Sequence, residues 1–118
     1  MFNVELDTKK LQKLAIQVDK ILREEIQNYR MKPDFSEARI FDIFVVGVQG
    51  DERTYGHPAE ITIKGPKHSD GKNYSDGDLN NFLNKLSGRI TNEVRGVNKV
   101  VYVVGERDNR TNLFKSLL

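Results

Sequence analysis

Two stretches of the sequence repeat their apolar residues every three or four positions, which is the spacing of one face of an α-helix. The first covers residues 7–29 and ends before Pro33, because proline cannot continue a helix. The second covers residues 75–94 and is followed by Gly96, which suits a left-handed position after a helix. Gly88 interrupts the second pattern, and we expect it to mark close packing against a sheet.

Three further stretches are rich in β-branched and apolar residues and predict strands. Residues 40–48 and 99–104 are apolar on both faces, whereas residues 59–64 alternate between apolar and polar side chains. Residues 34–39 are polar and are expected to connect the first helix to the first strand. The order α-β-β-α-β predicts an α+β fold, a two-layer sandwich with both helices on one face of a small antiparallel sheet.

The predicted strands present more apolar surface than two helices can cover. Two of the three strands are apolar on both faces, but helices on one side of a sheet bury only one face. We therefore expect the other face to be a protein–protein contact, and a symmetric homodimer through the sheet is the commonest form of such a contact. The alternative is that the tail of residues 113–118, which contains the apolar Leu113, Phe114, Leu117 and Leu118, folds over that face.

Composition narrows the class of protein. The 118 residues suit one domain, residues 1–118, and the net charge of +2 comes from interspersed acids and bases, which does not predict a nucleic acid or a membrane as partner. The absence of cysteine excludes disulfides, thiolate metal sites and cysteine nucleophiles. No apolar run approaches the roughly 20 residues of a membrane span, and no signal peptide is visible. We expect a cytoplasmic protein without a metal site or catalytic residues of its own.

The loop after the first predicted strand holds the densest set of groups that could contact a ligand. An amide, backbone N–H groups freed by glycine, a carboxylate and a guanidinium occur together at Gln49, Gly50, Asp51 and Arg53. Such groups can hold a purine or a phosphate, or they can hold the loop to itself through Asp51. The Gly-x-x-Gly at residues 47–50 also matches the phosphate-clamping loop of KH-type RNA-binding domains, but there the loop joins two helices.

Three longer motifs resemble one protein family. They are LQKLAIQVDKILREEI at residues 11–26, VVGVQGDERTYGHPAEI at residues 45–61 and SGRITNEVRGVNKVVY at residues 87–102. In this order and spacing they are similar to the C-terminal dimerisation domain of glutamine-hydrolysing guanosine monophosphate (GMP) synthase. The resemblance implies an α+β domain with antiparallel strands that dimerises and contributes to the site for xanthosine monophosphate (XMP). It places Gln49 where the family has a residue that contacts the xanthine nucleotide.

The same resemblance implies a division of labour. The complete enzyme aminates XMP with ATP, magnesium and ammonia from glutamine, whereas this sequence has neither cysteine nor an SGGVDS-like pyrophosphate loop. We therefore expect no cofactor on this chain and a separate ATP-pyrophosphatase subunit as partner. The family's closing SKPP-x-TIEWE is replaced by VVGERDNRTNLFKSLL, in which Lys115 has no matching context. The alternative is a stand-alone homodimeric binding or regulatory module that kept the fold and lost the substrate site, binding a purine nucleotide or RNA.

Overall fold

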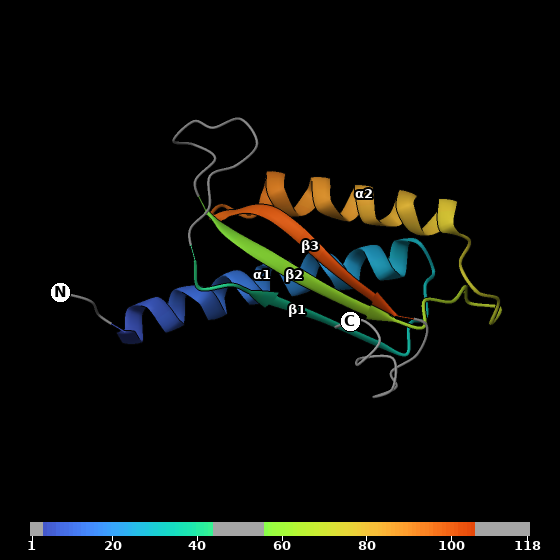
Figure 1. The fold of residues 1–118 in the computed structure, drawn as a ribbon, viewed down its shortest axis with the longest axis horizontal. Helices are drawn as coiled ribbons and strands as arrows, with labels where there is room; N and C mark the ends of the chain where they lie inside the picture. Colours follow the sequence, from blue (N-terminus) through green and yellow to red (C-terminus); the bar gives the residue numbers. More distant parts are fainter. Residues whose placement is uncertain (1–3, 44–55, 106–118) are drawn as a thin grey trace, which may run out of the picture.

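A computed structural model describes residues 4–43 and 56–105 of the chain, with side chains from residue 8 onward. The predicted order of elements is confirmed (Figure 1). The five elements are α1 (Val4–Asn28), β1 (Phe35–Ile40), β2 (His57–Lys64), α2 (Asp76–Glu93) and β3 (Val97–Gly105).

The sheet has the order β1-β2-β3 and is mixed, which corrects the prediction of an antiparallel sheet. β1 and β2 are antiparallel as expected, but β2 and β3 are parallel. The reason is the connection between them. α2 carries the chain from the carboxyl end of β2 back along the sheet (Figure 1). β3 therefore begins at the same end of the sheet as β2 and runs parallel to it. The carboxyl ends of β2 and β3 therefore lie side by side, next to the start of α2.

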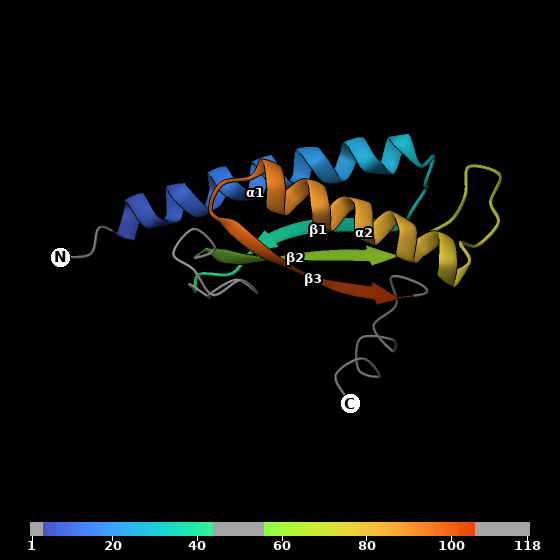
Figure 2. The same cartoon turned by 90° about the horizontal axis from the view of Figure 1, so that it is seen from above.

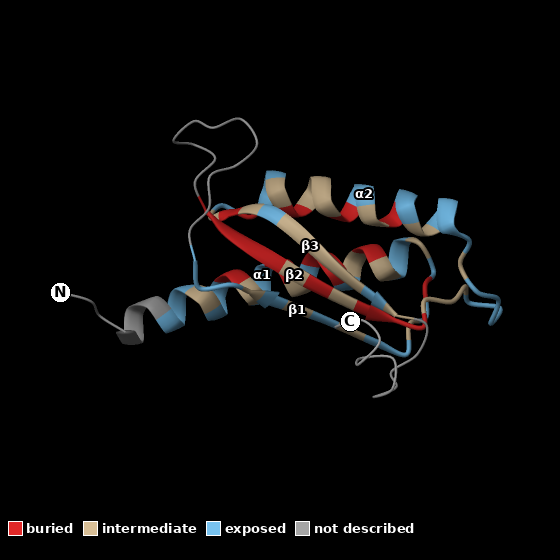
Figure 3. Ribbon diagram, viewed as in Figure 1, coloured by how far each residue is buried: buried red, intermediate tan, exposed pale blue. Residues whose placement is uncertain are grey.

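Both helices pack on the same face of the sheet, as predicted (Figure 2). The inward side chains of β2 are completely buried between them and the neighbouring strands, and β2 is the most buried strand of the sheet (Figure 3). Among the residues that form this core are Leu14, Val18, Leu22, Ala59, Ile61, Ile63, Phe82, Leu86 and Ile90. The described elements thus form two layers around one core.

The first strand lies earlier in the chain than predicted. β1 is formed by residues that read as a polar connector, whereas residues 41–43 are outside any strand and residues 44–48 are outside the described part. β1 is an edge strand, with Glu37 and Arg39 exposed on one side and Ala38 and Ile40 packed on the core on the other. A half-exposed edge strand needs few apolar residues, so its apolar content is a weak signal.

The helices follow the predicted pattern closely. α1 begins at Val4, three residues before the predicted start, and its predicted outer face at Lys13 and Gln17 is exposed. α2 begins after Ser75, whose hydroxyl accepts a hydrogen bond of 3.1 Å from the backbone N–H of Asp78. Gly96 has the expected left-handed conformation, with φ at 102°.

An ion-pair cluster joins the two helices. The guanidinium of Arg89 on α2 donates hydrogen bonds to Glu93 at 2.7 and 3.0 Å on the same helix, and to Glu24 and Glu25 of α1 at 2.9 and 3.2 Å. The side chain of Glu25 is only 2% exposed and also accepts a hydrogen bond of 2.7 Å from Asn28. A single guanidinium therefore links three carboxylates from two elements.

Candidate functional site

The four ligand residues predicted from the sequence, Gln49, Gly50, Asp51 and Arg53, lie outside the described residues. The two ends of the segment that carries them are held at the amino end of β2. The Phe41 backbone N–H donates to the Pro58 carbonyl at 3.0 Å, and Nδ1 of His57 lies 2.9 Å from the Phe41 carbonyl oxygen. Gly56 must be glycine, because a Cβ there would lie 2.7 Å from the carbonyl oxygen of Gly96. These contacts fix where the segment joins the domain.

The face of the sheet opposite the helices is the first candidate interaction surface. No described element covers it (Figure 2), and we call it the outer face. Val101 of β3 lies beside Glu60 of β2, and Glu60 lies beside Arg39 of β1. In the same way Val103 lies beside Thr62, and Thr62 lies beside Glu37. Val101 and Val103 are half-buried, while Phe35 at one end of this face is 37% exposed. Two further apolar residues just after β1 are exposed, Phe41 at 37% and Ile43 at 56%.

A groove of about 630 Å³ is the second candidate site. It lies where β2 and β3 end and α2 begins, and a short hairpin after β2 forms its rim. Lys67 and Asn73 form a β-bridge in this hairpin, and the His68 backbone N–H donates to the Lys72 carbonyl at 2.7 Å. The hairpin is held to the α1–β1 connection by a hydrogen bond of 2.7 Å from the Lys32 N–H to the Lys67 carbonyl. The rim of the groove is therefore tied to the rest of the fold.

Tyr74 is the aromatic residue of the groove. Its hydroxyl donates to the Tyr29 carbonyl at 2.7 Å, and its ring stacks on His68 with centroids 4.0 Å apart. Burial raises the pKa of Tyr74, and the nearby carboxylate of Asp78 raises it further. The phenol is consequently a neutral, fixed side chain at physiological pH.

The charged residues of the groove are two acids and one base. Lys67 and Asp34 form an ion pair of 2.9 Å between Nζ and Oδ1. Asp76, the first residue of α2, lines the same groove, where a carboxylate is favourable beside the positive end of the helix dipole. Within residues 8–43 and 56–105, no group of three or more His, Cys, Asp or Glu residues is arranged to hold a metal ion. Neither described helix is long and apolar enough to cross a membrane.

Comparison with known proteins decides the family. The model of the GMP synthase C terminal domain matches residues 24–112. Glutamine-hydrolysing GMP synthase of Helicobacter pylori is 37% identical over 101 residues, which is 83% of this chain and 19% of that protein. The enzyme of Halothermothrix orenii is 38% identical over 110 residues, 91% of this chain and 21% of that protein. That of Gloeothece citriformis is 37% identical over 92 residues, 76% of this chain and 17% of that protein.

This chain belongs to the GMP synthase C-terminal domain family. It spans about a fifth of the length of these curated relatives. The family match confirms the resemblance that the three sequence motifs indicated, and it includes the segment with Gln49.

The structure adds a physical link between two motifs of this GMP synthase domain. Glu24 and Glu25 of the LREEI motif bind Arg89 of the GRITNEV motif, and Glu93 of that second motif binds the same guanidinium. The groove could not be predicted from the sequence. Its residues Asp34, Lys67 and Asp76 are far apart in the chain and follow no recognised spacing, so only the fold brings them together.

Proposed function

We propose that this chain pairs with a second copy through the outer face of its sheet and contributes to the XMP site of a GMP synthase system. The observation that carries the first part is the outer face itself, with half-buried Val101 and Val103 on the edge strand β3 and exposed Phe35 on the other edge strand, β1. A sheet face that the described helices leave uncovered, and that carries apolar side chains among charged ones, is a candidate for a homodimer contact. The expected cytoplasmic location stays a prediction.

In the proposed system, glutamine hydrolysis and ATP cleavage take place on another polypeptide. The sequence of this chain has no cysteine to serve as a glutaminase nucleophile and no SGGVDS-like loop to bind the pyrophosphate of ATP. We propose that ATP and magnesium bind to a separate ATP-pyrophosphatase chain. The part of this domain is then to bring two copies together and to hold the nucleotide, and it is not catalytic by itself.

The dimer is tested by measuring molar mass with light scattering after gel filtration, over a hundredfold range of concentration. We expect a mass near twice the monomer mass of 13.6 kDa. A mass of one chain at every concentration would show that the outer face is covered within the chain, as in the alternative with residues 113–118, and would overturn the dimer.

The nucleotide site is tested separately by calorimetric titration with XMP. We expect Gln49→Ala to weaken binding by about tenfold, because the amide that the family places against the xanthine ring is lost. Gln27→Ala is the matched control, since Gln27 is an exposed amide on α1. Equal affinity in all three proteins would remove Gln49 from the site. A dimer that binds neither XMP nor an ATP-pyrophosphatase chain would favour the stand-alone module.

A further inference from the structure

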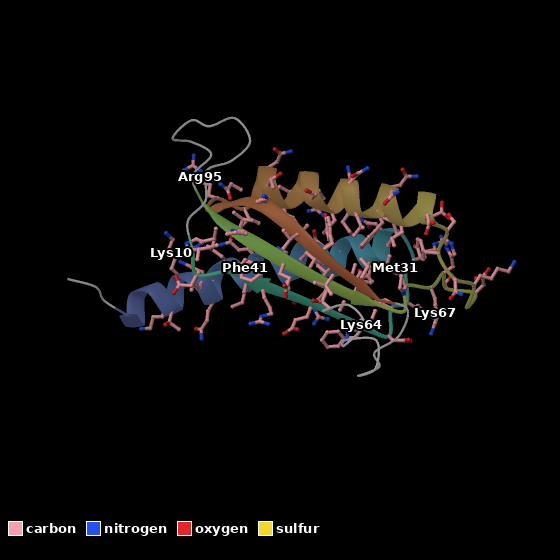
Figure 4. The ribbon with its side chains drawn as sticks, viewed as in Figure 1. Lys10, Met31, Phe41, Lys64, Lys67 and Arg95 are labelled. Carbon is pink, nitrogen blue, oxygen red and sulfur yellow. The ribbon has the colours of Figure 1, made fainter. Side chains whose placement is uncertain are left out.

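The groove beside Asp76 has no part in the proposed function. The segment with Gln49 joins the domain at the amino end of β2, whereas the groove lies at its carboxyl end. β2 has eight residues, so about 26 Å separate the two ends. Figure 4 shows Lys67 at the groove end of the sheet and Arg95 and Lys10 at the other end. The groove therefore lies at the opposite end of β2 from the two points where the Gln49 segment joins the domain.

The groove has the size and position of a small-ligand site. Its volume of about 630 Å³ falls within the usual range of such sites. It also lies at the carboxyl ends of two parallel strands, β2 and β3. Leu79 and Val104 form apolar parts of its wall. Tyr74 contributes ring carbon, because its hydroxyl is already bound to the Tyr29 carbonyl.

Two polar side chains of the wall have hydrogen-bonding capacity to spare. The side chains of Lys67 and Asp34 are already paired with each other in an ion pair. Within the described part of the chain, by contrast, the carboxylate of Asp76 and the amide of Asn73 have no hydrogen-bond or ion-pair partner, and both line the groove. A ligand can therefore bind them without breaking an existing contact.

The charges of the wall favour a ligand of one charge over the other. Lys67 balances Asp34, and Asp76 leaves the described side chains of the wall with one negative charge in excess, which the positive end of the α2 dipole partly offsets. A phosphate or carboxylate ligand would be repelled, whereas a cation is attracted. A carboxylate binds the planar guanidinium group through two parallel N–H donors, and an aromatic ring offers it a stacking surface. An aliphatic stem would contact Leu79 and Val104.

We propose that this groove binds a guanidinium group on an aliphatic stem, as in arginine, with Asp76 as its carboxylate and the Tyr74 ring and Asn73 beside it. The group is carried either by a free small molecule or by a protein segment. This proposal does not depend on dimerisation or on XMP, since no residue of the outer face or of the Gln49 segment takes part.

The test is a titration of the full-length ¹⁵N-labelled chain, followed by amide chemical shifts. The probes are free arginine, the capped tripeptide acetyl-Gly-Arg-Gly-amide, and the same tripeptide with citrulline, which is neutral but of nearly the same shape. We expect saturable shifts at Lys67, Asn73 and Leu79 with an arginine probe. Binding of the citrulline peptide should be weaker by about tenfold, because the charge-assisted pair is lost. Tighter binding of the tripeptide would indicate a protein source, and tighter binding of free arginine a small molecule.

Asp76→Asn supplies the variant and Asp78→Asn its matched control. Both carboxylates lie in the first turn of α2, but only Asp76 lines the groove. We expect Asp76→Asn to weaken binding of the preferred arginine probe by about tenfold and Asp78→Asn to leave it within about twofold. Equal shifts with citrulline, equal effects of the two variants, or stronger shifts with inorganic phosphate would each overturn the proposal.

Discussion

Two glycines of this domain have opposite physical meanings. Gly65 follows β2 with φ at 62°, and a Cβ there would overlap the carboxylate of Asp34. Both the backbone conformation and the space therefore require glycine. Gly88 was expected to mark close packing on the sheet, and this prediction is wrong, because a Cβ at Gly88 would meet nothing within 4 Å. Glycine inside a helix without a packing reason only adds flexibility to the unfolded chain.

Gly88→Ala should therefore stabilise the protein. Alanine has the higher helix propensity, and we expect the free energy of unfolding to rise by about 0.5–1 kcal/mol. Urea denaturation followed by circular dichroism would measure this change. Gly65→Ala is the control, and it should lower stability because of its positive φ and the contact with Asp34. A loss of stability in Gly88→Ala would show that the position is constrained by a contact outside the described residues.

At the scale of elements, Arg89 of α2 forms ion pairs with α1 through Glu24 and Glu25. Its side chain is 23% exposed, whereas that of Glu25 is 2% exposed, so the guanidinium covers a buried carboxylate. Hydrogen bonds from Arg89 lower the pKa of Glu93 and raise that of Arg89 itself. A carboxylate with a lowered pKa stabilises the fold above its unfolded pKa. This contribution is lost as the pH falls through the folded value, so it disappears in acid.

Arg89→Met should destabilise the domain by about 2 kcal/mol, because it leaves the buried carboxylate of Glu25 with Asn28 as its remaining partner. The variant should also lose part of the dependence of stability on acid pH. The free energies of unfolding of wild type and variant should therefore converge below about pH 4. Denaturant unfolding between pH 3 and pH 7 measures both effects. Arg23→Met is the matched control: Arg23 pairs with Asp19 at 2.7 Å but is 74% exposed. Equal effects of the two substitutions would refute the role of Arg89.

The elements differ in how well the sequence predicts them, and the difference follows their burial. α1, α2 and β2 have periodic apolar residues because one face of each lies in the core, so their patterns locate them to within a few residues. β1 lies at the edge and reads as polar. The parallel pairing of β3 depends on the path of α2, and no local pattern records it. The groove residues are also invisible in sequence, since Asp34 and Asp76 meet only after folding.

At the scale of the whole molecule, the open face of the sheet raises the question of whether folding is linked to association. α1 and α2 cover one face of the sheet, and the described elements leave the other open (Figure 2). If a second copy covers the outer face, folding and association are linked, and the melting temperature must rise with protein concentration. A chain that is stable alone would melt at the same temperature at every concentration.

A charge on the outer face separates these two cases. Val101 lies beside Glu60 in the sheet, so Val101→Asp places two carboxylates side by side on the proposed contact. We expect it to weaken association by about a hundredfold and to remove the concentration dependence of melting. Phe35→Asp is a second variant, at an exposed edge position that the core does not need, and it should act in the same direction. Ile16→Asp, which is 69% exposed on α1, is the control and should remain a dimer. Folded variants with an unchanged mass and the same concentration dependence as the wild type would show that the two copies meet elsewhere.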